Sequence, residues 1–154
     1  MSRNLPLYYI CDMNILISAC LLGQKCRYDG KDKNKTDLSA LEGHKLIPVC
    51  PEVDGGLPVP RPAAERVGSL VINKEGTDVT AEYTKGAELA LQTAVKNNCK
   101  IAILKAKSPS CGKGKIYDGS FTRTLTDGNG VTAELLQANG ITVYTEDEIN
   151  LIQL

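Results

Sequence analysis

The sequence predicts an α/β fold: a single-domain, three-layer, Rossmann-like fold with a mostly parallel sheet. Short apolar segments alternate along the chain with longer amphipathic ones, which is the pattern of strands joined by helical crossovers. The chain has 154 residues, of which 42% are hydrophobic, so one domain can bury a core of its own. In such a sheet, ligands bind at the carboxyl ends of the strands.

Four short apolar runs are predicted to form the buried strands of the sheet. They span residues 14–19, 45–50, 100–105 and 141–144. The second run contains Pro48, which has no backbone N–H to donate to a neighbouring strand. We therefore expect this strand to have an unpaired side or a bulge at Pro48.

Helices are predicted between these strands and after the last one. They span residues 38–43, 81–98, 131–139 and 146–154. Asp37 and Thr80 are expected to cap the first two, and Gly140 to end the third. The longest helix carries an apolar stripe that should face the core. The stripe consists of Ala87, Leu91, Ala94 and Val95.

The remaining segments are predicted to be loops. Residues 51–68 contain four prolines and form a long, stiff loop, a kind of segment that is usually functional in compact domains. Residues 69–72 and 78–79 flank a Glu75-Gly76 turn and predict a small hairpin. Residues 108–130 are rich in Gly, Ser and Thr and predict a loop with a local hairpin.

The domain is predicted to span residues 13–154, with residues 1–12 as an N-terminal extension. Residues 17–20 resemble the cleavage box of a bacterial lipoprotein signal, but Asp12 and Asn14 lie where that signal should be apolar. An Asp at the centre of an inserting segment costs about 2.5–3.5 kcal/mol. With no apolar run long enough to span a membrane, we expect a cytoplasmic protein without a membrane partner.

The charge balance argues against a nucleic-acid partner. The chain has 18 Lys and Arg against 18 Asp and Glu, whereas phosphate binding favours an excess of basic residues. Aromatic residues make up 5% of the chain, which is too few for a platform that stacks single-stranded bases. A small molecule is therefore the expected partner.

Three of the six cysteines follow predicted strands. Cys20, Cys50 and Cys111 come at or shortly after the ends of the first three strands, so a parallel sheet brings them to one edge. Three thiolates predict a soft metal or an iron–sulfur cluster, with one metal position left open for chemistry. The alternative is that these cysteines are small buried hydrophobic residues.

The other three cysteines are weaker candidates. Cys26 lies near Cys20 and is a candidate fourth ligand. Cys99 precedes a strand and is expected in the core, and Cys11 lies outside the predicted domain.

Two residues near the cysteines are candidates for acid–base chemistry. Glu52 lies two residues after Cys50, and Pro51 between them fixes its direction; the alternative is an exposed loop carboxylate. Ser108 begins a Ser-Pro-Ser-Cys-Gly segment, where the alternative role is hydrogen bonding within a turn. The single histidine, His44, is predicted at the far end of the second strand from Cys50, which argues against Cys–His nucleophilic chemistry.

Taken together, four segments resemble the thiouracil desulfidase family, a former domain of unknown function found widely in bacteria. The resemblance covers about residues 13–145. Its segments are Ser18-Ala19-Cys20-Leu21-Leu22-Gly23, Arg27-Tyr28-Asp29-Gly30, Val49-Cys50-Pro51-Glu52-Val53 with Gly56-Leu57-Pro58 and Pro60-Arg61-Pro62, and Leu104-Lys105 with Ser108-Pro109-Ser110-Cys111-Gly112.

The resemblance implies an oxygen-sensitive 4Fe-4S cluster held by three cysteines, which fall on Cys20, Cys50 and Cys111. The fourth iron would bind the sulfur of a thiolated base or nucleoside. The implied reaction is not a redox reaction: water replaces the sulfur, 2-thiouracil becomes uracil, and hydrosulfide leaves. The family's catalytic Glu and Ser fall on Glu52 and Ser108.

Two alternative functions remain open at this point. The same three cysteines plus a water could form the site of a zinc hydrolase. The chain could also be a non-enzymatic carrier of sulfide or of a cluster. The sequence leaves open whether the substrate is a free base, nucleoside or nucleotide, and whether the chain forms a homo-oligomer.

Overall fold

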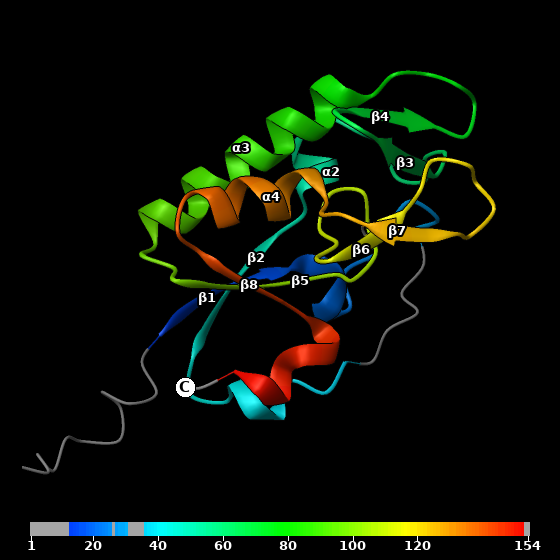
Figure 1. Cartoon of the computed structure of the whole chain (residues 1–154). Helices are drawn as coiled ribbons and strands as arrows, with labels where there is room; N and C mark the ends of the chain where they lie inside the picture. Colours follow the sequence, from blue (N-terminus) through cyan, green and yellow to red (C-terminus); the bar gives the residue numbers. More distant parts are fainter. Residues whose placement is uncertain (1–12, 26, 31–35, 153–154) are drawn as a thin grey trace, which may run out of the picture.

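The computed structural model describes residues 13–25, 27–30 and 36–152. Its centre is a four-stranded sheet with the order β2-β1-β5-β8, in which all neighbours are parallel. The strands are β1 (Asn14–Ser18), β2 (Lys45–Val49), β5 (Ile101–Leu104) and β8 (Thr142–Thr145). The predicted α/β fold with a parallel sheet is therefore confirmed (Figure 1). Pro48 lies on β2, an edge strand, as its missing N–H requires.

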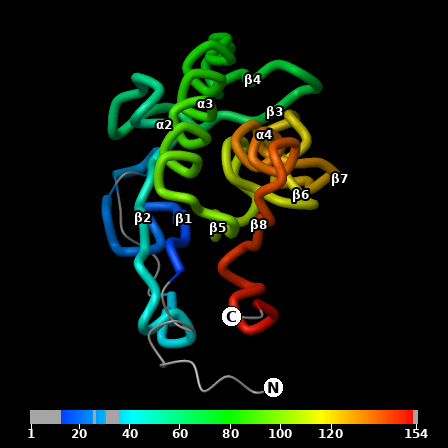
Figure 2. The backbone as a smooth tube through the Cα atoms, turned by 90° about the vertical axis from the view of Figure 1, so that its left-hand side faces the viewer, coloured from blue at the N-terminus to red at the C-terminus, as the bar shows by residue number. Residues whose placement is uncertain are grey.

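Helices cover both faces of the sheet, which gives three layers (Figure 1, Figure 2). On one face, Leu16 packs with the α-helices α3 (Thr80–Lys96) and α4 (Val131–Ala138). On the other face, Ile15 and Ile17 pack with 3₁₀ helices. Alternate residues of β1 thus enter two separate cores. The 3₁₀ helices are η1 (Ala19–Leu22), η2 (Ser39–Leu41) and η3 (Glu146–Leu151).

The segment 51–68 is not the continuous loop that the sequence predicted. It contains the short helix α2 (Pro51–Asp54), which Pro51 starts because a proline fits the first turn of a helix. It also contains β3 (Ala64–Val67), which pairs with β4 (Leu70–Asn73) in an antiparallel hairpin. The prediction from proline content missed both elements, since prolines flank them rather than interrupt them.

The predicted small hairpin between residues 69–72 and 78–79 is present in a short form. Asp78 makes an antiparallel bridge to Ile72, and the Val79 N–H donates to the Val71 carbonyl at 2.9 Å. The sequence did not predict that β4 also pairs with β3 on its other side. The hairpin predicted inside residues 108–130 is present, and it consists of β6 (Lys115–Tyr117) and β7 (Leu125–Asp127).

The long helix α3 starts at Thr80 instead of being capped by it. The Thr80 hydroxyl accepts a hydrogen bond from the Val71 N–H, and the Asp78 carboxylate accepts one from the Thr80 N–H. The buried stripe runs through Tyr83, Gly86, Ala87, Ala90 and Ala94. Val95 is 65% exposed and lies outside this stripe, so its predicted burial is wrong.

The order of the strands determines where a site can form. From β1 the chain goes to β2 on one side of the sheet, and then crosses to β5 on the other side of β1. The carboxyl ends of these three strands therefore meet where the strand order reverses, which is the usual ligand position in parallel sheets. None of the helices in the described part of the chain is long and apolar enough to cross a membrane. Residues 1–12 lie outside the described residues, so the predicted domain boundary at residue 13 stays a prediction.

Candidate active site

A cavity of about 570 Å³ lies at the carboxyl ends of β1, β2 and β5. Its wall includes all five residues that the sequence predicted for the site: Cys20, Cys50, Glu52, Ser108 and Cys111. The chain brings these residues together from segments that lie up to 91 positions apart in the sequence. Basic and aromatic side chains from the hairpins complete the wall.

Two of the cysteines are positioned directly by the ends of β1 and β2. Cys20 lies in η1, which follows β1 without a gap and ends at Gly23, whose φ of 88° favours glycine. Cys50 is the residue before α2, and its N–H donates to the Asp54 carboxylate at 3.2 Å. Both side chains are half-buried.

The helix α2 is held in place by very close packing on α3. A Cβ at Gly86 would lie 1.8 Å from the Pro51 carbonyl oxygen, and a Cβ at Gly55 would lie 2.0 Å from the Glu82 carbonyl oxygen. Only glycines permit this approach of two backbones. The direct contact between α2 and α3 fixes the short helix that carries Glu52 and begins next to Cys50.

The third cysteine lies on a turn that caps α4. The Pro109 and Ser110 carbonyl oxygens accept hydrogen bonds from the first N–H groups of α4, at 2.9 Å from Val131 and 2.8 Å from Thr132. Such partners satisfy donors that a helix start leaves free. The turn that holds Cys111 is therefore anchored to a helix, and Cys111 itself is 4% exposed.

Hydroxyl groups surround the buried Cys111 thiol. Burial raises the pKa of Cys111 to about 12, and the Glu52 and Cys50 charges act in the same direction. Hydrogen bonds from Ser18 and Ser110 oppose this rise, because they stabilise the thiolate. The Ser18 hydroxyl oxygen also accepts the Lys105 N–H at 3.0 Å, which leaves its own hydrogen for the sulfur.

The Glu52 carboxylate is held by two buried side chains. Arg61 donates to Oε2 through Nε at 3.2 Å and Nη2 at 3.0 Å, and the Tyr83 hydroxyl donates to the same oxygen at 2.8 Å. Burial first, and then the charge of Glu52, raises the pKa of Tyr83 far above its usual value, so the phenol remains a donor. Among the described residues, every hydrogen bond to the carboxylate falls on Oε2, and none on Oε1.

Ser108 makes hydrogen bonds within a turn, which is the alternative role inferred for it from the sequence. Its hydroxyl oxygen accepts the N–H groups of Ser110 and Cys111, both at 3.1 Å. These bonds shape the turn around Cys111 and leave the hydroxyl hydrogen available as a donor. Ser108 therefore both organises the turn and lines the cavity.

The remaining candidates are placed elsewhere. Cys99 is buried in the core as predicted, and His44 precedes β2, at the opposite end of that strand from Cys50. Cys11 and Cys26 lie outside the described residues. Within the ranges that the structure describes, no three His, Cys, Asp or Glu side chains surround a single metal-ion position. A cluster has a different requirement, since each of its thiolates binds its own iron atom.

Sequence reasoning gave no role to Arg61, Tyr83 or Ser18. Arg61 and Ser18 lie within the segments that carry the family resemblance, and this was the only available signal for them. Tyr83 gave no signal, because it reaches Glu52 only through the packing of α3 against α2.

Comparisons with known proteins agree with this site. The family model described as 2-thiouracil desulfurase matches residues 15–148. A Bacillus subtilis (strain 168) protein, described as uncharacterized protein YbbK, is 39% identical, and the match covers 88% of this chain and 97% of that protein. The solved structure of TudS, described as a [4Fe-4S]-dependent thiouracil desulfidase, is 48% identical with a TM-score of 0.86, and the match covers 90% of this chain and 94% of that one. The predictions of the family and of an enzyme are thus confirmed, and the chain belongs to the 2-thiouracil desulfurase family.

Proposed function

We propose that this enzyme is a [4Fe-4S]-dependent desulfidase that converts 2-thiouracil and water to uracil and hydrosulfide. The observation that carries the proposal is the cavity itself, whose wall contains three cysteines from three separate segments together with Glu52. The name of the TudS relative supports both the cofactor and the substrate class.

The side chains of the cavity fit an iron–sulfur cluster. The described lining offers three thiols and no histidine, and thiolates are the usual ligands of such clusters. We propose that Cys20, Cys50 and Cys111 are the ligands. When bound by these three cysteines, the cluster would supply Lewis-acid chemistry suited to a soft thiocarbonyl sulfur, through an iron without a protein ligand.

The residues around Glu52 suit a general base. Arg61 and Tyr83 fix Oε2, so Oε1 is the atom that accepts a proton from the attacking water. A carbon–oxygen bond forms, the carbon–sulfur bond breaks, and the sulfur leaves with one water proton as hydrosulfide. The other proton passes through Glu52 to solvent. The Ser108 hydroxyl donates a hydrogen bond to the substrate or relays this proton.

We also propose that the enzyme works in the cytoplasm on a small thiolated base or nucleoside. The described cysteines Cys20, Cys99 and Cys111 form no disulfide, which suits a reducing compartment. Such a compartment also suits a cluster that is sensitive to oxygen.

The test combines metal analysis and turnover on one anaerobically purified sample. We expect iron and acid-labile sulfide in equal amounts, and multiple turnovers with excess 2-thiouracil that release uracil and hydrosulfide. Zinc without iron would contradict the proposal and favour a hydrolase. A reaction that stops near one equivalent per chain would favour a sulfide carrier.

A further inference from the structure

The loop between β6 and β7 brings the only phenylalanine of the chain to the wall of the cysteine cavity. Phe121 lines this cavity together with Tyr28, Tyr83 and Tyr117. The chain has six tyrosines, one phenylalanine and no tryptophan, and four of these aromatic residues meet at this one cavity. Aromatic side chains concentrated at a cavity indicate a flat, apolar-faced ligand.

The backbone of Phe121 has a conformation that a bulky residue rarely adopts. Its φ is 57°, in the left-handed region. In the described part of the chain, three other non-glycine residues have a positive φ, and two of them, Lys107 and Arg123, line the same cavity. Such conformations persist only where the surrounding structure imposes them, and they are concentrated at binding sites.

A buried carboxylate on β3 imposes this conformation. Glu65 is 8% exposed, and its Oε1 accepts the N–H groups of Gly119 at 2.9 Å and Phe121 at 3.1 Å. A Cβ at Gly119 would lie 2.4 Å from a Val67 methyl carbon, so the loop packs directly on β3. The Asp118 N–H closes the loop by donating to the Thr124 carbonyl at 2.9 Å. The loop is therefore organised before any ligand arrives.

We propose that Phe121 is a substrate-binding residue whose ring stacks on the thiolated pyrimidine, and that Glu65 is the positioning residue that holds it there. The proposal rests on the proposed function, because the stacked ring is that of the substrate. Stacking acts mainly on the ring atoms that do not react and that stay flat before and during the reaction. Its loss therefore raises KM and leaves kcat nearly unchanged.

Steady-state kinetics on the iron-loaded enzyme test the role of Phe121. Phe121→Leu should raise the KM for 2-thiouracil on the order of tenfold, and Phe121→Tyr should keep the wild-type value. Iron content should be unchanged in both variants. An unchanged KM in Phe121→Leu would overturn the proposal.

A double-variant comparison tests the positioning role of Glu65. Glu65→Ala should raise KM much as Phe121→Leu does, and the double variant should be no worse than either single variant, since both changes remove the same contact. Glu65→Gln should restore most of the affinity, because its amide oxygen still accepts the two N–H groups. Additive effects would mean that Glu65 has a merely structural role.

A fluorescence measurement distinguishes this proposal from the proposed function. Phe121→Trp gives the chain its only tryptophan, whose emission should fall when 2-thiouracil stacks on it. Tyr144→Trp, on β8 and away from the cavity wall, is the matched control for light absorbed by the ligand. If wild-type enzyme turns over 2-thiouracil but the Phe121→Trp emission matches the control, the stacking proposal alone fails. If wild-type enzyme shows no turnover, the proposed function fails.

Discussion

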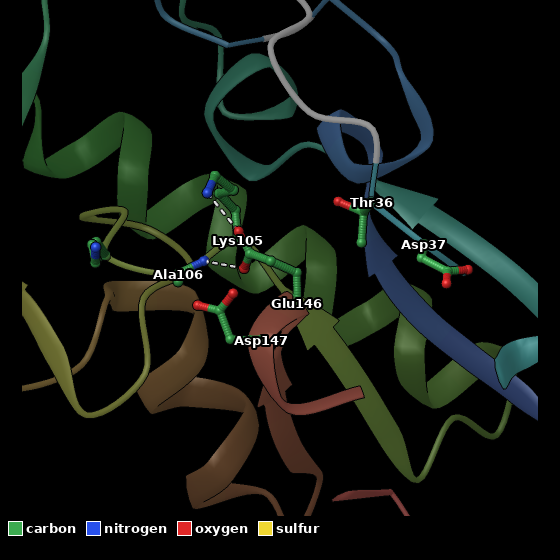
Figure 3. Close-up of a pocket in the computed structure, with 7 residues that line it drawn as sticks. Thr36, Asp37, Lys105, Ala106, Glu146 and Asp147 are labelled. Atoms are coloured by element: carbon green, nitrogen blue, oxygen red, sulfur yellow. Dashed lines mark hydrogen bonds and ion pairs between the residues drawn. The ribbon is translucent and has the colours of Figure 1, made fainter. Parts of the chain in front are cut away.

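Two cavities share the segment that follows β5 as a common wall. Lys105, Ala106 and Lys107 line both the cysteine cavity and a second cavity of about 460 Å³. Among the described residues, the second cavity is otherwise lined by Thr36, Asp37, Glu146 and Asp147, none of which carries sulfur or an aromatic ring (Figure 3). The two cavities therefore have similar size and a shared wall but very different chemistry.

Glu146 accepts the hydrogen bonds that connect the two walls of the second cavity. The Glu146 carboxylate accepts hydrogen bonds from the Lys105 ammonium group and from the Ala106 N–H, the latter at 2.7 Å (Figure 3). These contacts join the start of η3 to the end of β5. Charges that are paired within the protein in this way indicate a structural connection rather than a site.

The cysteine cavity differs because its polar groups stabilise two reactive side chains, the Cys111 thiolate and the Glu52 carboxylate. Ser18 and Ser110 stabilise the thiolate of a cysteine whose burial opposes ionisation, and the described partners of Glu52 all bind its Oε2. A bound metal would stabilise this thiolate further, because cysteine binds metals in its deprotonated form. This contrast supports the proposal that the cysteine cavity is the active site, and the following variants test it.

The largest effect is expected from the three proposed ligands. Cys20→Ser, Cys50→Ser and Cys111→Ser should each lose most of the bound iron and all measurable desulfuration, because a hydroxyl is a poor ligand for an iron–sulfur cluster. Cys99→Ser is the control, since Cys99 lies in the core away from the cavity, and it should keep its iron. Anaerobic iron analysis measures the difference. Equal iron loss in Cys99→Ser would contradict the ligand assignment.

The second-largest effect is expected from Glu52→Gln. Glutamine has nearly the same shape but cannot accept a proton from water, so kcat should fall by about 10²–10⁴-fold while iron content and thiouracil binding persist. Anaerobic assays of both proteins, corrected for iron, provide the measurement. Activity within about threefold of wild type would assign the base role to another group.

The central sheet and the two hairpins also differ in how far the sequence predicts them. Strand and helix periodicity predicted the parallel sheet, and hence the position of Cys20, Cys50 and Cys111 at one edge, because burial in a sheet leaves a strong local signal. The hairpins β3–β4 and β6–β7 left a weaker signal, since their exposed strands do not alternate strictly between polar and apolar residues.

The partners of Glu52 could not be predicted from any local pattern. Arg61 follows Glu52 by nine residues in a proline-rich segment, and Tyr83 lies 31 residues away on α3. Tyr83 meets Glu52 because Gly55 and Gly86 let α2 and α3 touch at the backbone. Such a contact depends on how two helices pack in the folded protein. In the sequence alone, a glycine within a predicted helix indicates only that the helix is less stable.

A smaller effect is expected from Tyr83→Phe, which removes one donor from Glu52 and keeps the buried ring. The loss of a hydrogen bond to a charged group should lower the free energy of unfolding by about 1.5–3 kcal/mol. The kcat should fall less than in Glu52→Gln, because Arg61 still holds Oε2. Burial keeps the pKa of Tyr83 high, so this difference should not change between neutral and mildly alkaline pH. Urea unfolding and kcat at several pH values measure both effects, and Tyr144→Phe is the control.

The smallest effect is expected from Glu146→Gln in the second cavity. The amide oxygen still accepts the Ala106 N–H, so only the attraction to Lys105 is lost. Both side chains are partly exposed to solvent, which limits the expected loss of unfolding free energy to about 0.5–1 kcal/mol. High salt should reduce this difference, since it screens the wild-type pair. Because Glu146 lines the second cavity and not the cysteine cavity, kcat should stay within about twofold of wild type. A tenfold or larger fall in kcat would show that the Lys105 charge acts on the reaction, and that the two cavities form one site.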